Sequence, residues 1–223
     1  MKLKQILCIA VLFALALTMF GACGSSKTPK NSGDSSLPEY SNPYLDALPV
    51  AGNWGGYEWV VIKKEEGRLL CITKEIIEVR RFHDTEEPVS WAESDLRAYL
   101  NGEFFENTFS ADKSKNAVQP LLTEHTNGSV DFPNGSTGTG SEPTEDSVFL
   151  LSYEEAEDCF ISDAARVAAY DSYGQIWWLR SPGDYLNNFA NVDGIGQVCY
   201  SSSNFHADGL GVRPAIWIPR PAE

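Results

Sequence analysis

Oxygen-rich and aromatic side chains gather toward the C-terminus, and no other residues of this chain are better suited to ligand binding. The stretch from Asp184 to Asp208 combines amide and carboxylate groups with the rings of Tyr185 and Phe205. Such oxygen atoms can hydrogen-bond sugar hydroxyls or coordinate calcium, and aromatic rings can stack on apolar faces. The candidate ligand-binding residues are Trp177, Asp184, Tyr185, Asn187, Asn188, Asp193, Asn204, Phe205, His206 and Asp208.

The same residue types also have a purely structural interpretation. Asn, Asp, Ser and Gly are ordinary turn residues, so a solvated loop without a ligand is an equal alternative. The loops lack the spaced acidic residues of a calcium hand, and the cysteine spacings do not suit zinc. We therefore predict no metal and no cofactor.

Two tryptophans and two arginines lie within apolar segments near these loops. Neighbouring residues on a strand face opposite ways, so we expect one of Trp177 and Trp178 in the core and the other partly exposed. Arg180 and Arg213 could clamp a ligand carboxylate. A buried guanidinium also needs internal partners, so we favour internal ion pairs that hold the final strands together.

Catalytic arrangements are weakly indicated. Ser152 follows an apolar run but lacks the Gly-flanked elbow that exposes a nucleophile. The histidines His83, His125 and His206 have no motif around them, and among 31 acidic residues no pair is singled out as a general acid and base. We therefore predict no catalytic residue, and whether the protein is an enzyme stays open.

The N-terminus predicts export and a lipid anchor. Lys2 and Lys4 precede an apolar run that is short for a membrane span, which is typical of a signal peptide over residues 1–22. The run ends in Phe-Gly-Ala-Cys, which resembles the bacterial lipobox, although Phe20 replaces the usual leucine. Cys23 is thus the predicted lipid attachment site of an extracytoplasmic protein held at the cell membrane.

Composition predicts a tether, one domain and the class of partner. Residues 23–52 are rich in Ser, Asn and Pro and predict a flexible tether, while residues 53–223 are long enough for a single globular domain. The net charge of −14 repels phosphate backbones, so we exclude nucleic acid. Cys71, Cys159 and Cys199 would remain in the domain as small buried thiols or with at most one disulfide.

Short strands are predicted at both ends of the domain, with helices between them. Residues 57–63 and 68–73 form a predicted hairpin around Gly67, and Ser94 is placed to cap a helix over 91–101. Residues 127–146 predict a long irregular excursion. The other expected strands are 76–82, 148–152, 176–182, 196–201 and 211–218, and the other helices are 103–109 and 153–160. This order is typical of an α+β fold with short antiparallel strands and long loops.

Several short phrases stand in an order that resembles a known family. They are Glu-Trp-Val-Val at 58–61, residues 91–101, Val-Phe-Leu-Leu-Ser at 148–152, Trp-Trp-Leu-Arg-Ser-Pro-Gly at 177–183 and Gly-Val-Arg-Pro-Ala at 211–215. Together they resemble the bacterial domain of unknown function 6273, which implies an envelope protein of Gram-positive bacteria without an assigned activity.

A more remote resemblance links the Trp-rich strand, the long loops and the closing Gly-x-Arg strand to the C-type-lectin-like fold of formylglycine-generating enzymes. That fold implies paired terminal strands, two or more flanking helices and irregular loops that carry binding sites. The carbohydrate-binding Glu-Pro-Asn triplet of C-type lectins is absent, and Cys159 and Cys199 are too far apart in sequence to match the enzymes' catalytic pair.

Three functions remain to be weighed. The first is a non-catalytic, lipid-anchored envelope module that recognises glycan or protein through its C-terminal loops. The second is a structural or assembly lipoprotein without a small ligand. The third is an enzyme related to the formylglycine-generating enzymes, which would need two nearby thiols or a metal. Fold alone does not choose among them.

Overall fold

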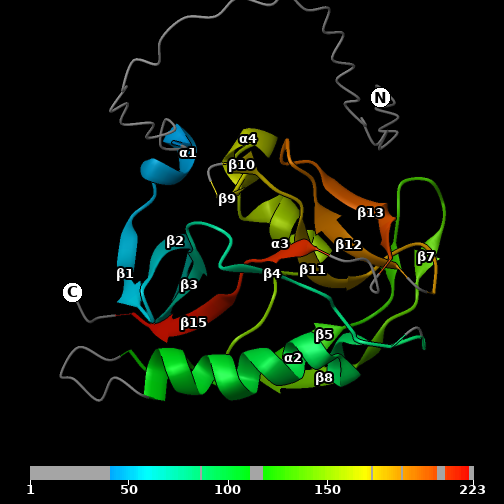
Figure 1. The fold of residues 1–223 in the computed structure, drawn as a ribbon, viewed down its shortest axis with the longest axis horizontal. Helices are drawn as coiled ribbons and strands as arrows, with labels where there is room; N and C mark the ends of the chain where they lie inside the picture. The colour runs from blue at the N-terminus through cyan, green and yellow to red at the C-terminus, as the bar shows by residue number, and fades with distance from the viewer. Residues whose placement is uncertain are drawn as a thin grey trace, which may run out of the picture. The chain divides into compact units, whose positions relative to one another are not determined.

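The computed structural model describes residues 41–85, 87–110, 118–171, 173–186, 188–204 and 209–220, with backbone alone at residues 173 and 201–204. These residues belong to one compact unit that begins at Tyr40. Helices and many short strands together make an α+β fold in which strands predominate (Figure 1). Within the described ranges, no helix is long and apolar enough to cross a membrane.

The first sheet joins the two ends of the domain. Its strand order is β1-β2-β3-β15, and all its pairings are antiparallel. The predicted hairpin is confirmed, with Gly67 at φ 76° in the turn where a side chain would be strained. The strands are β1 (Val50–Trp54), β2 (Tyr57–Glu65), β3 (Arg68–Thr73) and β15 (Ala215–Pro219).

The second sheet carries most of the C-terminal half. Its order is β13-β12-β11-β14-β4, and β11 pairs with β14 in parallel, unlike the purely antiparallel pairing we expected. The strand predicted over 76–82 is reduced to three residues. The members are β4 (Glu78–Arg80), β11 (Trp177–Pro182), β12 (Asn188–Val192), β13 (Val198–Asn204) and β14 (Leu210–Val212).

Three two-stranded pairs complete the strand content. The pair of β5 with β8 begins and ends the stretch over 127–146 that we predicted to be irregular, and the pair of β6 with β7 lies inside it. The pairs are β5 (Thr123–Asn127) with β8 (Ser141–Asp146), β6 (Val130–Asp131) with β7 (Thr137–Gly138), and β9 (Ala169–Tyr170) with β10 (Tyr173–Gly174).

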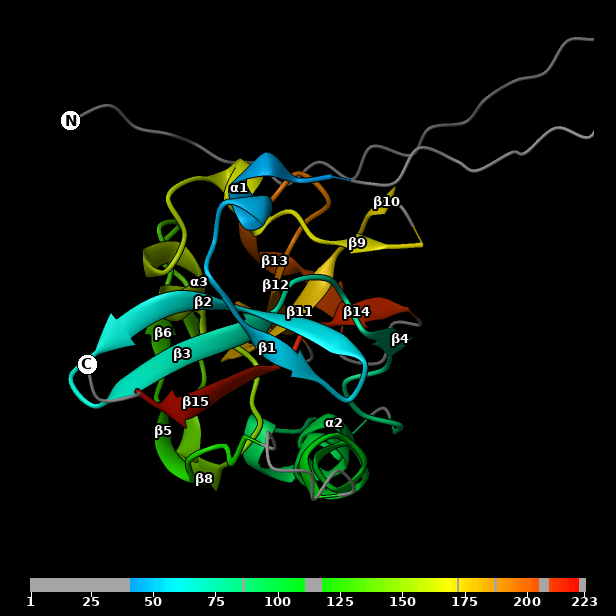
Figure 2. The same cartoon turned by 90° about the vertical axis from the view of Figure 1, so that its left-hand side faces the viewer.

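The helices are short except for one continuous segment along the edge of the domain (Figure 2). Ser94 accepts a hydrogen bond from Arg97 N and caps this segment, as predicted, but the two helices expected there are one helix. The helical elements are α1 (Pro43–Asp46), η1 (Trp91–Glu93), α2 (Asp95–Tyr99), η2 (Leu100–Phe104), η3 (Glu106–Ser110), α3 (Tyr153–Asp158) and α4 (Asp163–Arg166).

The folded domain starts before the boundary that we predicted at residue 53. Leu45 of α1 is fully buried, and the Asn42 side chain donates to the carbonyls of Ala164 at 2.9 Å and Val167 at 2.8 Å. Strand β1 then pairs with β2. One apolar anchor and one capping asparagine are therefore enough to fix a segment whose composition predicted a tether.

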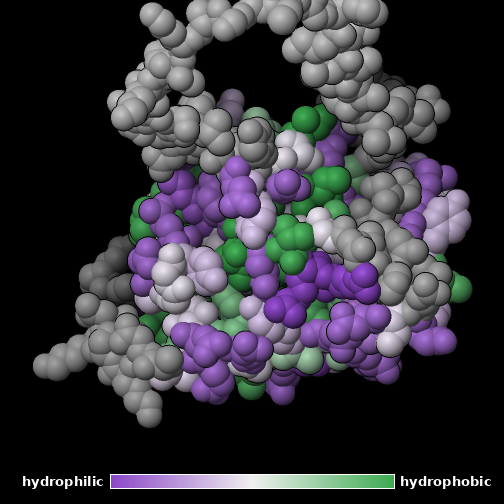
Figure 3. All heavy atoms as spheres, in the orientation of Figure 1, coloured by the Kyte–Doolittle hydropathy of each residue, from purple (hydrophilic) through white to green (hydrophobic). Residues whose placement is uncertain are grey.

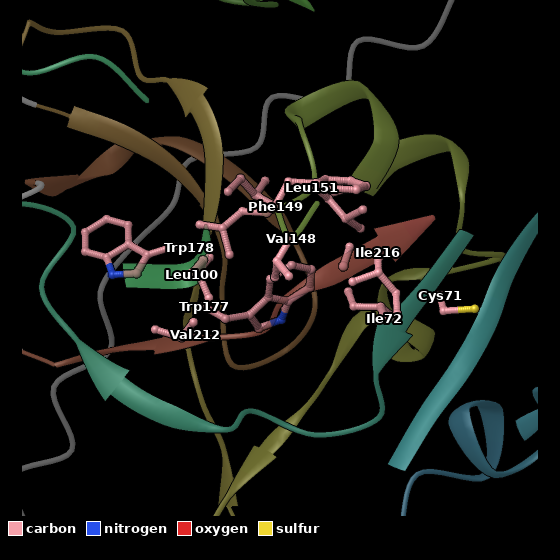
Figure 4. Packing of buried hydrophobic residues seen from close by; sticks show 14 of the residues in the cluster. Cys71, Ile72, Leu100, Val148, Phe149, Leu151, Trp177, Trp178, Val212 and Ile216 are labelled. Atoms are coloured by element: carbon pink, nitrogen blue, oxygen red, sulfur yellow. The ribbon is translucent and has the colours of Figure 1, made fainter. Parts of the chain in front are cut away.

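The segment from Val148 to Leu151 is fully buried but is not a regular strand. Phe149 makes a single bridge to Ala215, and Leu151 O accepts from Arg180 N at 2.9 Å. The run is thus hydrogen-bonded to β15 of the first sheet and β11 of the second at one point each, and its side chains belong to the core (Figure 4). Its apolar sequence reflects this burial, which periodicity does not distinguish from a strand.

Both tryptophans of β11 are fully buried, which corrects the prediction that one would be partly exposed. They point away from each other (Figure 4), and each face of the strand is covered. Trp178 packs on Phe82 with ring centroids 5.5 Å apart, and Trp177 lies under Arg213. The predicted alternation of the two side chains along the strand is correct, but both are buried because both faces of the sheet are covered.

Candidate functional site

A cavity of about 170 Å³ lies where the end of β11 meets the end of β5 and the segment before η1. It is built from four stretches of chain that are distant in sequence. The lining residues are Pro88, Val89, Ser90, Trp91, Asn127, Thr139, Gly140, Ser141, Arg180, Pro182, Tyr185, Leu186, Asn188 and Phe189. The space far exceeds the roughly 10–15 Å³ that one water molecule needs.

An irregularity in β11 brings Arg180 to this cavity. Trp178 pairs with Asn191 and Pro182 with Phe189, so the register shifts between these two pairs. Arg180 lies in the bulged stretch, and its backbone N–H donates to Leu151 O at 2.9 Å instead of to β12. Bulges of this kind redirect side chains next to binding sites.

The Arg180 side chain forms an internal ion pair, as we predicted, but its partner Glu155 lies on α3, so the pair joins β11 to that helix and not the final strands to each other. Arg180 Nη1 donates to Glu155 Oε2 at 2.5 Å and to Leu150 O at 2.7 Å. Burial would raise the pKa of the Glu155 carboxyl, but the Arg180 charge and hydrogen bond, with the Ser152 N–H, outweigh it and lower that pKa. The guanidinium is thus held in place and its charge is compensated.

One further nitrogen of Arg180 remains unused. The residue is 5% exposed, and its buried Nε has no hydrogen-bond partner among the described residues. Leaving a buried polar group unsatisfied costs about 1–3 kcal/mol, and folded proteins contain few such groups. Arg180 therefore lines the cavity and also carries a buried donor without a partner.

Asn127 lines the cavity from the end of β5. The residue is 7% exposed, and its Nδ2 donates to Glu142 O at 3.0 Å and Thr144 Oγ1 at 3.2 Å. These two bonds fix the orientation of the amide. Its buried Oδ1 has no partner within the described part of the chain.

His125, two residues earlier on β5, is a buried neutral imidazole. Its ring centroid lies 4.0 Å from that of Phe149. Burial first, and then the nearby Arg180 charge, lower the pKa of His125 to about 4. The residue does not line the cavity, and its ring packs on Phe149 near the Arg180–Glu155 ion pair.

The lowered pKa of His125 predicts acid sensitivity. The unfolded chain binds a proton near the ordinary value of 6.5, whereas the folded protein resists protonation until about 4, so stability falls as the pH drops through this window. We expect wild type to lose about 2 kcal/mol more than His125→Gln between pH 7 and pH 5. Urea titrations at both pH values measure this difference, and equal losses would contradict the assignment.

Aromatic and apolar side chains form the rest of the cavity wall and its rim. Trp91 is 1% exposed and Phe189 is 2% exposed, so both present ring surface from the core. Tyr185 and Leu186 are 69% and 74% exposed at the rim. Trp91 is fixed by its Nε1, which donates to Asp146 Oδ2 at 3.0 Å.

The structure brings Tyr185 and Asn188 of the predicted site to this cavity and separates others from it. Trp177 is fully buried in the core, which removes it from the candidate site. Asp193 instead forms a turn, where its Oδ1 accepts from Ile195 N at 3.0 Å and Gln197 N at 2.8 Å. Asp184 is half-buried behind the rim, and burial raises the pKa of its carboxyl.

The remaining predicted residues cannot be placed in the same detail. Asn204 is described by its backbone alone, which pairs with Asn188 across β12 and β13. Asn187, Phe205, His206, Asp208 and the lipid attachment residue Cys23 lie outside the described residues. The predicted loop region is also largely strand, because β12 and β13 run through it.

Several cavity residues were missed or misread from the sequence. Asn127 lies in a polar stretch without periodicity, and nothing in the sequence marks it. Arg180 was singled out but assigned only a structural role, although the structure gives it both that role and a place on the cavity wall. The sequence signal that could have placed Arg180 at the site was a lone arginine in an apolar strand.

Metal and thiol chemistry are not assembled by the described residues. Within them, no three His, Cys, Asp or Glu side chains gather as metal ligands. Cys71 and Cys159 are free thiols, so Cys159 is not bridged to Cys199. Burial raises the pKa of Cys71 to about 12 and that of Cys159 to about 11, which makes both poor nucleophiles.

Comparison with known protein families gives a match. Residues 66–220 match the model of the family described as "Domain of unknown function (DUF6273)"; this range runs from β3 to β15 and includes every residue that lines the cavity, while β1 and β2 precede it. No curated protein and no solved structure matches the chain. The function must therefore be argued from the residues themselves.

Proposed function

Because this chain belongs to the family described as domain of unknown function 6273, whose description names no activity, we propose its function from the site. The domain is a non-catalytic binding module that takes a glycan or protein group into the cavity beside Tyr185 and Asn188. The observation that carries this proposal is the convergence of exposed Tyr185, half-buried Asn188 and the buried polar residues Arg180 and Asn127 on one cavity.

The fold proposed for the module is C-type-lectin-like. In support, the C-terminal strand β15 pairs with β3 of the N-terminal hairpin, and helices α2 and α3 lie beside the sheets (Figure 1). The cavity is built at the end of the sheet where loops and short strand pairs connect. A C-type-lectin-like fold would carry its ligand-binding site in this position.

The proposed location is the outer face of a cell membrane, with lipid on Cys23. The support is the sequence: a basic start, a short apolar run and small residues before that cysteine. On the face shown in Figure 3, hydrophobic residues are interspersed among hydrophilic ones. With a net charge of −14, such a surface would be repelled by anionic headgroups.

The proposal predicts that Tyr185 and Asn188 each support binding. A glycan array with the full chain identifies the ligand, and isothermal titration then compares variants. Loss of a stacking ring or of an amide hydrogen bond weakens binding by about 1–2 kcal/mol, so Tyr185→Ala and Asn188→Ala should each raise Kd about tenfold. Tyr44→Ala and Asn53→Ala, exposed elsewhere, serve as controls and should leave Kd unchanged.

Pull-downs with the full chain and its variants distinguish a binding module from a structural scaffold. Leu186 at the cavity rim and Leu122 elsewhere are both exposed. A protein partner that is retained after glycan digestion would identify the rim as a protein-binding surface if Leu186→Ala releases it and Leu122→Ala does not. A stoichiometric partner insensitive to every rim and cavity variant would instead establish an assembly lipoprotein. The enzyme alternative gains no support from the free thiols of Cys71 and Cys159, whose pKa values are raised by burial.

A further inference from the structure

The cavity reaches from solvent-exposed residues to the aromatic core. Tyr185 and Leu186 are largely exposed, and they line it together with the buried residues Trp91 and Phe189. Most of the surface inside the cavity is apolar. An apolar group that enters from solvent would therefore leave water for apolar contacts, which is favourable.

The aromatic residues of the cavity wall are held in place without a ligand. The Phe189 ring stacks on Phe82 with centroids 3.7 Å apart, and the Trp91 ring packs on Phe82 at 5.9 Å. Trp91 is also fixed by its hydrogen bond to Asp146. A wall that is already ordered loses little conformational freedom on binding, so more of the contact energy appears as affinity.

The volume of the cavity matches one small ring. It measures about 170 Å³, which is below the roughly 300–1,000 Å³ of sites for drug-sized ligands. An apolar cavity of about 150 Å³ accommodates benzene. A ring of that size would also gain the ring–ring contacts that aromatic side chains make beyond simple burial, here with Trp91 and Phe189.

The charges around the cavity favour a neutral group. Among the described residues that line it, only Arg180 is charged, and its Nη1 lies 2.5 Å from Glu155 Oε2. The guanidinium is already paired, so it offers little attraction to an anion. A cation would approach Arg180 without a carboxylate on the lining to compensate for the repulsion.

The rim favours a protein over a free small molecule. A single ring inside the cavity would leave most of the exposed surface of Tyr185 and Leu186 in water. The body of a protein that carries this ring would cover both residues. Protein interfaces commonly combine one aromatic anchor in a pocket with surrounding contacts that exclude water. The aliphatic side chain of Leu186 also suits a protein surface better than a polar glycan chain.

We infer that the cavity binds one aromatic side chain of a protein partner, which enters beside Tyr185 and Leu186 and packs against Trp91 and Phe189. This inference rests on the proposed binding function and specifies its partner. The anchor ring supplies most of the binding energy, and the rim keeps water away from it.

A random peptide library displayed on phage tests the inference with defined probes. The full chain serves as the bait, and the selected peptides are synthesised and titrated by calorimetry. We expect the binders to share one Phe or Tyr. Replacing that residue by alanine, lysine or glutamate should weaken binding at least tenfold, because the anchor is lost or is charged.

Two matched pairs of variants locate the binding on the protein. Thr139 lines the cavity, so Thr139→Trp should block peptide binding, whereas Thr137→Trp on neighbouring β7 should not. Leu186→Asp puts a charge at the rim and should weaken binding at least tenfold, whereas Leu122→Asp should leave it unchanged. All four residues are exposed, so these substitutions should leave the fold intact.

The outcomes separate this inference from the proposed function. Binders without a shared aromatic residue, or binding that either Thr139→Trp or Leu186→Asp leaves unchanged, would overturn the inference. If no peptide is selected, but a glycan binds the wild type and loses affinity in Tyr185→Ala, the inference fails and the proposed function stands. If neither a peptide nor a glycan binds, both fail.

Discussion

Replacing Arg213 by methionine will lower the free energy of unfolding by about 4 kcal/mol. Arg213 is fully buried, and it donates to Thr73 O at 3.0 Å, Lys74 O at 3.0 Å and Arg166 O at 3.1 Å. Methionine fills a similar space but leaves the carbonyls of Thr73 and Lys74 without these donors. The Arg166 carbonyl still accepts from Trp177 Nε1 at 3.2 Å, so removing the Arg213 donor costs less free energy at this carbonyl.

Arg213 ties the end of β3 to the end of α4 at the junction of β14 and β15, so its loss should loosen both sheets together. Urea unfolding followed by tryptophan fluorescence measures the change. Arg68→Met is the control, because Arg68 is partly exposed, pairs with Glu65 and lies over Trp217. We expect that variant to lose less than about 1 kcal/mol. Equal losses in the two variants would refute the role given to Arg213.

Replacing Asp146 by alanine is the second large effect, again about 4 kcal/mol. Asp146 is fully buried on β8, and its carboxylate accepts from Arg97 Nε at 2.7 Å and Trp91 Nε1 at 3.0 Å. Thr144 Oγ1 adds a bond of 2.8 Å, and Asn101 Nδ2 one of 3.3 Å. Alanine leaves these donors without their acceptor and disconnects the long helix from β8.

The loss in Asp146→Ala should be local as well as large. Hydrogen exchange should show reduced protection over residues 91–110 relative to β2 and β3, because the carboxylate accepts from Trp91, Arg97 and Asn101 of that segment. Asp131→Ala is the control, since Asp131 is exposed and its carboxylate accepts from Thr137 Oγ1 at 2.7 Å. We expect that control to change stability by less than about 0.5 kcal/mol. A uniform loss of protection in Asp146→Ala would contradict the local role.

Two kinds of sequence signal predicted structure well. Local backbone chemistry placed the turn at Gly67 and the helix cap at Ser94, because each depends on residues only a few positions apart. Binary patterning placed the hairpin of β2 and β3 and the short helix α3. Short sequence motifs between Glu58 and Ala215 also indicated the family, and the match of the family model to residues 66–220 confirms it.

The pair of β5 and β8 was missed for a physical reason. Both strands alternate between buried and exposed positions, but the buried positions are His125, Asn127, Thr144 and Asp146. A search for alternating apolar residues cannot find a strand whose inward face is polar. The inward polar face also includes Asn127, which lines the cavity.

The fold class, the local turns and caps, and two residues of the candidate site, Tyr185 and Asn188, could be predicted from short stretches of sequence. The burial of both β11 tryptophans, the redirection of Arg180 by a bulge and the placement of Asn127 on the same cavity could not. Those outcomes depend on sheet order and strand register, which are set by contacts between residues far apart in the chain. The cavity arises from such contacts, because Arg180 and Asn127 lie on strands that come together only in the folded protein.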